Sequence, residues 1–321
     1  MHRRTVLANL GAAAACSLLP AAGVAQTATA LTSLRIGYQK NGVLLVAKQQ
    51  RLFETRFAAL GLEVSFHEFA FGPPLLEALS AGSLDYGTTG DAPPIFAQAA
   101  RAKLYYAASL PARGEGQAII VPPESPIKTL ADLRGRKVGV AKASSAHNLL
   151  IAALEAEGIG YDEITPLYLA PADAASAYAR GAIDAWSIWD PYYAIAELSK
   201  TGARRLPIRP AAQVQNSFFL SNRGFTDQHP EIVTAINEEL AQASLWIEQN
   251  RDAAARLFAE ATGVSLEAQS RTVARAEFKI APLSEAVIAQ QQAVADRFFK
   301  LGLIPKPITV RDIVWTGQSA A

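Results

Sequence analysis

One turn of this chain carries four side chains that can donate hydrogen bonds to an anion: Lys142, Ser144, Ser145 and His147. They follow a short apolar strand and precede a stretch with apolar residues at helical spacing. The first turn of a helix has backbone N–H groups without partners and a partial positive charge, so it attracts anions. This turn contains no carboxylate. The sequence therefore predicts an anion-binding site at residues 142–147.

Each of these residues also has a simpler interpretation, which stays open at this point. Ser144 or Ser145 is expected to cap the helix through its hydroxyl group, with or without a ligand. Lys142 can be a solvated strand end. His147 can pack against the first turn with its hydrogen bonds satisfied inside the protein.

Two further helix starts combine an aspartate with proline. Asp91 precedes Ala-Pro-Pro, and Asp190 precedes Pro191. Aspartate is a favoured N-cap, and proline suits the first turn because it has no N–H to leave unpaired. We interpret both aspartates as caps, with ligand contact as the alternative. Gly90 and Trp189 stand directly before them, at the ends of two predicted strands.

The tryptophans of the second stretch have two possible roles. Trp186 and Trp189 lie in one predicted strand, where both can belong to the core. A tryptophan at a strand end beside Asp-Pro also suits the wall of a cleft.

The elements that must position these residues form an internal repeat. Alternating strands and helices predict an α/β fold with parallel strands covered by helices. The first copy has strands at 34–38 and 62–69 and helices at 43–53 and 74–81; the second has strands at 136–140 and 164–169 and helices at 147–157 and 173–180.

Two short apolar strands, 118–121 and 218–220, are interpreted as the two crossings between the copies. This gives a discontinuous first lobe, 34–117 plus 221–321, and a second lobe, 118–220. Amphipathic helices fill 226–299. Open α/β sheets bind ligands outside the carboxyl ends of their strands, so the site is expected in a cleft between two lobes.

Composition and targeting signals exclude several classes of protein. Lys and Arg number 30 against 29 for Asp and Glu, with no basic run, which argues against nucleic acid as a partner. Residues 1–25 are predicted to be a signal peptide, with Arg3-Arg4 hinting at twin-arginine export to the periplasm. The only cysteine, Cys16, lies in this segment, and we expect no lipid anchor there because the apolar run continues past it. No metal-binding or hydrolase motif is evident, and we expect no cofactor.

The sequence resembles the periplasmic aliphatic-sulfonate-binding proteins of ABC importers, a group related to taurine- and nitrate-binding proteins. The segments that carry the resemblance are LRIGYQKNG (34–42), GSLDYGTTGDAPPIFAQAA (82–100), SPIKTLADLRGRKVGVAKASSAHNLL (125–150), GAIDAWSIWDPYYA (181–194) and LIPKPITVRDIVW (303–315). The family often has Glu at the position of Asp91 and Gly-Ser-Asn at the position of Ala143-Ser144-Ser145.

The resemblance implies a two-lobed binding fold of type II, with two Rossmann-like lobes and a ligand sulfonate in the cleft. It also implies a monomer that delivers its ligand to a membrane permease driven by a cytoplasmic ATPase. The family's cleft positions fall on Gln39, Gly90, Asp91, Ser144, Ser145, His147, Trp189 and Asp190.

A sulfonate is a monoanion with three acceptor oxygens and no proton to donate. Neutral donors and a helix start suit it, because they satisfy the oxygens without a buried counter-charge. A neutral His147 is expected to donate one N–H, and Asp91 is expected to meet an amine on an aminosulfonate tail. The rival hypotheses are a binder of taurine, nitrate or a pyrimidine precursor, and a desulfinase-like enzyme. The enzyme is disfavoured because desulfinases rely on a cysteine nucleophile.

Overall fold

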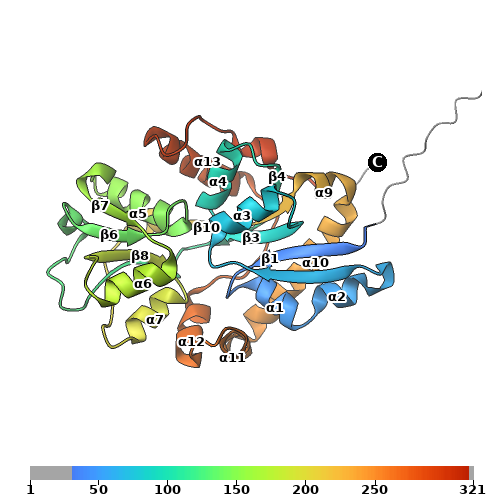
Figure 1. Ribbon diagram of the computed structural model, residues 1–321, viewed down its shortest axis with the longest axis horizontal. Coiled ribbons are helices and arrows are strands. Elements are labelled where there is room, and N and C mark those ends of the chain that lie inside the picture. Colours follow the sequence, from blue (N-terminus) through green and yellow to red (C-terminus); the bar gives the residue numbers. More distant parts are fainter. Residues whose placement is uncertain (1–30, 318–321) are drawn as a thin grey trace, which may run out of the picture. The chain divides into compact units, whose positions relative to one another are not determined.

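The computed structural model describes residues 31–317, which contain two five-stranded mixed sheets (Figure 1). The predicted signal peptide, with Arg3-Arg4 and Cys16, lies outside these residues. The first sheet has the order β2-β1-β3-β10-β4. Its strands are β1 (Ser33–Tyr38), β2 (Glu63–Glu68), β3 (Tyr86–Gly90), β4 (Leu104–Ala112) and β10 (Gln215–Asn222).

The second sheet, drawn in green in Figure 1, repeats the pairing pattern of the first. Its order is β7-β6-β8-β5-β9. In each sheet, the first strand of the repeat pairs in parallel with the next two: β1 with β2 and β3, and β6 with β7 and β8. An antiparallel strand then follows, β10 beside β3 and β5 beside β8. The strands are β5 (Gln117–Val121), β6 (Lys137–Val140), β7 (Thr165–Tyr168), β8 (Ala185–Trp189) and β9 (Arg204–Arg205). The predicted α/β fold is confirmed.

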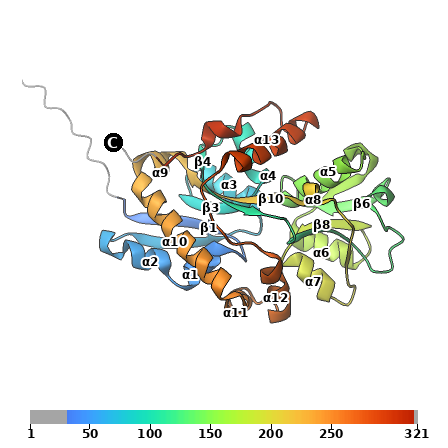
Figure 2. The same ribbon diagram turned by 180° about the vertical axis from the view of Figure 1, so that it is seen from behind.

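The helices pack against the sheets and against one another. Helix α5 contacts β5 and β8, α3 and α4 contact β3, and α10 contacts β4 (Figures 1 and 2). Of the helices that follow β10, α11 contacts α1 of the first copy and α12 contacts α7 of the second. The helices are α1 (Val43–Gln49), α2 (Leu52–Phe57), α3 (Gly72–Ser80), α4 (Ala92–Ala99), α5 (Ser145–Ala156), α6 (Pro171–Ala179), α7 (Tyr192–Leu198), α8 (Pro210–Gln213), α9 (Arg223–Gln228), α10 (Pro230–Gln249), α11 (Arg251–Thr262), α12 (Leu266–Arg275) and α13 (Glu285–Lys300).

The apolar core is divided between the two sheets. Phe218 of β10 packs with Leu75, Ile95 and Phe298 in a cluster of the first sheet. The second sheet has a cluster on each side, one with Leu150 of α5 and another with residues of α6 and α7. Burial of apolar surface on this scale is the main favourable contribution to folding. Each sheet therefore has the core that it needs to hold its strand ends in place.

Two predicted elements differ from the structure. The helix predicted at 43–53 is broken into α1 and α2, because Arg51 has a left-handed φ of 56°. Such a residue cannot continue a right-handed helix. The strand Phe218–Leu220, predicted as a crossing at the edge of the second copy, lies inside β10 of the first sheet, between β3 and β4.

The chain crosses between the sheets in the short segments before β5 and before β10. Gly114 lies in the first of these segments with φ +79°, and a Cβ there would be 1.8 Å from the carbonyl oxygen of Gln213 in the second. The two crossing segments therefore touch, and only glycine allows the approach. We propose two lobes, one around each sheet. No helix within residues 31–317 is both long enough and apolar enough to cross a membrane.

Candidate functional site

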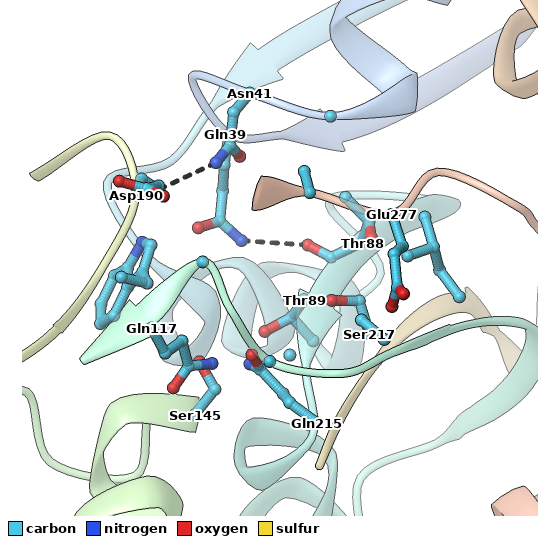
Figure 3. A pocket seen from close by; sticks show the side chains of 18 of the residues that line it. Gln39, Asn41, Thr88, Thr89, Gln117, Ser145, Asp190, Gln215, Ser217 and Glu277 are labelled. Carbon is cyan, nitrogen blue, oxygen red and sulfur yellow. Dashed lines mark hydrogen bonds between the residues drawn. The ribbon is translucent and has the colours of Figure 1, made fainter. Parts of the chain in front are cut away.

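A pocket of about 190 Å³, partly open to solvent, lies where the carboxyl ends of β1, β3 and β8 meet the start of α5 (Figure 3). Six of the ten residues predicted to bind ligand line it: Gln39, Gly90, Ser144, Ser145, Trp189 and Asp190. The other four, Asp91, Lys142, His147 and Trp186, do not. The structure thus brings together predicted residues from both copies of the repeat.

The start of α5 faces this pocket, and Ser144 is its N-cap as predicted. The Ser144 hydroxyl group donates to the carbonyl of Ala141 at 2.6 Å and accepts from the amide of His147 at 3.3 Å. Both hydrogen bonds of this hydroxyl group are therefore made within the turn, and only 2% of the residue is exposed. The neighbouring Ser145 is half-buried and lines the pocket. The amides of His147 and Asn148 bond to the carbonyl of Ser144, so the amides of Ser145 and Ala146 are the ones at this end that suit an anion.

Ala143 has a left-handed φ of 60° that turns the chain from β6 into α5. This conformation is unfavourable for alanine by roughly 1–2 kcal/mol. A glycine at this position would avoid that cost. The backbone N–H of Ala143 donates to Nδ1 of His147 at 3.3 Å, which helps to hold the turn.

His147 is fully buried, and both nitrogens of its ring have partners. Nδ1 accepts from Ala143, and Nε2 is 2.8 Å from the hydroxyl of Tyr161. Burial, with a smaller effect of Lys142, lowers the pKa of His147 to about 4. A ring with this pKa is neutral at pH 7, in line with the prediction. In this structure the ring supports the turn from inside and does not line the pocket, and its contact with a ligand stays a prediction.

Asp91 is the N-cap of α4 as predicted, but it lies outside the pocket. Oδ1 accepts from the amide of Ala92 at 2.7 Å, and Oδ2 accepts from Nδ2 of Asn148 at 2.7 Å. Asn148 Oδ1 in turn accepts from Arg297 at 2.8 Å. Burial raises the pKa of Asp91 to about 7. Only 2% of the residue is exposed in this arrangement, and its contact with a ligand amine stays a prediction.

The two remaining predicted residues also lie outside the pocket. Trp186 is buried in the core beside Tyr178, because strand alternation turns it to the face covered by α6 and α7. Lys142 is exposed and lies over the ring of Tyr168, with Nζ 5.4 Å from its centre. The simpler interpretation therefore applies to each of them: Trp186 is a core residue, and Lys142 is a solvated strand end.

Asp190 reaches the pocket as a member of an ion-pair network. Its Oδ1 accepts from the amide of Ala194 in the first turn of α7 at 2.9 Å, so it stabilises that helix start although α7 begins at Tyr192. Arg275 of α12 donates to the same carboxylate at 3.3 Å and also pairs with Glu197. Burial raises the pKa of Asp190 to about 6, and Arg275 opposes the rise. The cation of this pocket is thus already neutralised by protein carboxylates.

The comparisons with known proteins agree with this geometry. Residues 27–263 match the NMT1-like family. A protein of Escherichia coli (strain K12) named as an aliphatic sulfonates-binding protein is 39% identical over 285 residues, which cover 88% of each chain. The chain belongs to this family of binding proteins.

Two solved structures of aliphatic sulfonate-binding proteins share the fold. The alkanesulfonate-binding protein SsuA of Xanthomonas axonopodis pv. citri, bound to MOPS, is 42% identical with a TM-score of 0.84 over 88% of this chain and 98% of that one. The periplasmic aliphatic sulphonate-binding protein SsuA of Escherichia coli is 39% identical, with a TM-score of 0.80 over 88% and 97%. The predicted resemblance is confirmed.

Several residues of this family member's pocket were not predicted from the sequence. Asn41 donates through Nδ2 to the carbonyl of Asp190 at 3.0 Å, which joins the first copy of the repeat to the second (Figure 3). Gln117, Gln215, Ser217 and Arg275 also line the pocket. Gln117 opens the apolar strand β5, and this polar first residue was the signal that could have indicated it. Gln215 opens β10, whose first three residues are all polar, so no such contrast marks it. Arg275 has no such signal, because its position depends on how α12 folds back.

The donor set does not suit a metal ion. No group of three or more His, Cys, Asp or Glu side chains with metal-binding geometry occurs in the part of the chain that is described. Amides, hydroxyls and helix N–H groups predominate at the end of the pocket near α5. This arrangement can bind oxygen acceptors on an organic anion.

Proposed function

We propose that the protein binds an aliphatic sulfonate in this pocket and delivers it to the permease of an ABC importer. The observation that carries the proposal is the start of α5, which presents the half-buried Ser145 and its first-turn amides to a pocket lined from both sheets. Membership of the sulfonate-binding family supports the same ligand class.

The neutral donors at the α5 end of the pocket favour a monoanion, whereas the carboxylates of Glu115, Asp190 and Glu277 line other parts of it. Arg275 is the one Lys, Arg or His side chain among the described lining residues, and Asp190 and Glu197 already pair with it. A sulfonate needs hydrogen-bond donors more than a counter-ion, because its charge is spread over three oxygens. Neutral donors and the helix dipole supply them without an uncompensated buried charge.

The apolar part of the lining gives the ligand's carbon tail a place. Val43, Pro93, Leu110 and Trp189 contribute to it. Burial of each tail methylene contributes about 0.8 kcal/mol, so sulfonates with several carbons are expected to bind more tightly than methanesulfonate. Inorganic sulfate has a fourth oxygen in place of the tail, and that oxygen would face this apolar lining without a donor.

Contacts between the two proposed lobes suggest how binding is signalled. Asn41 bonds Asp190 at 3.0 Å, and Asn148 bonds Asp91 at 2.7 Å. A ligand that contacts both lobes stabilises the arrangement in which these bonds are made. We propose that the permease, with its cytoplasmic ATPase, recognises this form on a protein exported to the periplasm by residues 1–25.

The test is a ligand series with the purified protein lacking residues 1–25. The melting temperature should rise with 1-propanesulfonate and 1-butanesulfonate and not with sulfate at equal concentration, because a ligand of the native state stabilises it by mass action. Ser145→Ala should reduce the shift, whereas Ser176→Ala, on the exposed face of α6, should leave it unchanged.

Other outcomes point to the rival functions. A shift with taurine or nitrate and none with alkanesulfonates would contradict the proposal in favour of those ligands. Sulfite release from a sulfinate or sulfonate would indicate a desulfinase-like enzyme. We expect none, because the one cysteine lies in the signal segment and the relatives are binding proteins.

A further inference from the structure

The side chain of Gln117, at the start of β5, is buried with its amide oxygen unpartnered among the described residues. The residue is 4% exposed, and its Oε1 has no partner within residues 31–317. Other buried glutamines are fixed through Nε2: Gln269 donates to Thr262 at 3.1 Å, and Gln291 donates to the carbonyl of Asp91 at 2.7 Å. A buried side-chain amide without its hydrogen bonds is unfavourable for stability and calls for an explanation.

The unpartnered Oε1 is an acceptor that a sulfonate oxygen cannot satisfy, so the position of the NH₂ group decides whether Gln117 can serve a ligand. Gln117 lines the pocket, and in the strand register it lies opposite Trp189. Figure 3 shows its amide nitrogen turned toward the interior of the pocket, at the end where Ser145 and Gln215 also point. An amide donor in this position can serve a bound molecule.

Gly90 lies close against two further donors at this end. A Cβ at Gly90 would be 3.0 Å from Oγ of Ser145 and 3.3 Å from Nε2 of Gln215. Glycine therefore lets the end of β3 approach both polar atoms. They come from separate elements, α5 and β10, while Gln117 belongs to β5.

We propose that Gln117 and Gln215 are ligand-binding residues that complete a three-donor site with Ser145. One amide N–H of each glutamine and the Ser145 hydroxyl donate to the three oxygens of a sulfonate. The inference rests on the proposed function and deepens it, because it assigns the donors and the selectivity. A carboxylate has two oxygens in one plane, so it cannot present a separate oxygen to each of three donors arranged for the three oxygens of a sulfonate.

Isothermal titration calorimetry of 1-propanesulfonate tests the assignment. Gln117→Met and Gln215→Met should each weaken binding at least about tenfold, the effect of losing a hydrogen bond to a charged group. Gln117→Glu should weaken it more than about a hundredfold, because a like charge then faces the anion. The matched control is Gln269→Met, since Gln269 is also buried with an unpartnered Oε1 but does not line the pocket. Butanoate should bind the unaltered protein at least about tenfold more weakly than 1-propanesulfonate.

A measurement on the unaltered protein avoids dependence on folding of the variants. In ¹⁵N-labelled protein, the side-chain NH₂ resonances of Gln117 and Gln215 should shift when 1-propanesulfonate is added, and that of Gln269 should not. Tight sulfonate binding with unchanged glutamine resonances, or with wild-type affinity in both folded Met variants, overturns this inference and leaves the proposed function intact. Absence of any saturable sulfonate binding overturns both.

Discussion

Substitution of Gly90 by alanine tests whether the end of β3 and the start of α5 close on the ligand. The added methyl group would be 2.7 Å from Cβ of Ser145, closer than real Cβ contacts allow. Gly90 belongs to the first sheet and Ser145 to a helix packed on the second. The clash therefore arises where the two proposed lobes meet and not inside one core.

The size of the effect follows from the geometry. Overpacking by one methyl group in a close-packed contact costs about 1–3 kcal/mol. If the lobes can separate slightly, the free protein relieves the overpacking. The closed, ligand-bound form cannot relieve it and is destabilised by the full amount. The affinity for 1-propanesulfonate should then fall about 5-fold to about 150-fold, since 1.4 kcal/mol corresponds to a factor of ten.

The assay is calorimetric titration of Gly90→Ala beside urea unfolding of the free protein. The free energy of unfolding should stay within about 1 kcal/mol of the unaltered value, since the clash can be relieved by movement. Gly224→Ala is the control, because a Cβ there meets nothing closer than 3.4 Å and lies outside the pocket. Wild-type affinity in a folded Gly90→Ala protein would refute the reasoning.

Three further predictions concern buried polar groups. The His147 ring should stay neutral from pH 8 down to pH 5 in an NMR titration, because burial lowers its pKa to about 4. In the unfolded chain the ring is protonated at higher pH, so the stability that the neutral ring contributes is lost as the pH falls from about 6.5 toward 4. Asp91 makes stability change with pH in the opposite direction. Because its pKa is raised to about 7, the native state keeps a proton that the unfolded chain has lost, so stability falls as the pH rises from about 4 to 7. Asp91→Asn should therefore flatten the pH dependence of urea unfolding across that window, and an unchanged slope would contradict the account. Arg275→Met should destabilise the protein by about 3 kcal/mol at pH 8, where the buried Asp190 carboxylate loses its cation; the loss should be smaller at pH 5, because Asp190, with a pKa of about 6, can then be protonated.

Local patterns in the sequence were sufficient to predict the helices and strands that position the site residues. Apolar spacing and the Ser144 cap predicted α5, and the Asp91 and Asp190 motifs predicted the starts of α4 and, within two residues, α7. These features depend on neighbours within about four residues, where propensity and capping act. The same locality explains why the repeat of strands and helices was visible without a structure.

The differences from the structure arise where distant contacts decide. His147 and Asp91 were expected in the cleft because of their place in the chain, but Tyr161 and Asn148 hold them inside the protein. Nothing near Phe218 in the sequence shows that β10 enters the first sheet between β3 and β4. Arg275 reaches Asp190 across 85 residues of sequence. Such pairings depend on the packing of whole elements, which periodicity alone does not determine.

The central claim is that neutral donors at the start of α5 hold a sulfonate between the two sheets. A crystal structure of the protein with 1-propanesulfonate tests it most directly. We predict sulfonate oxygens within about 3.2 Å of the Ser145 hydroxyl group, with the propyl chain against the apolar lining. A sulfonate bound elsewhere, or one paired with Arg275 or Lys142 and away from Ser145, would contradict the account.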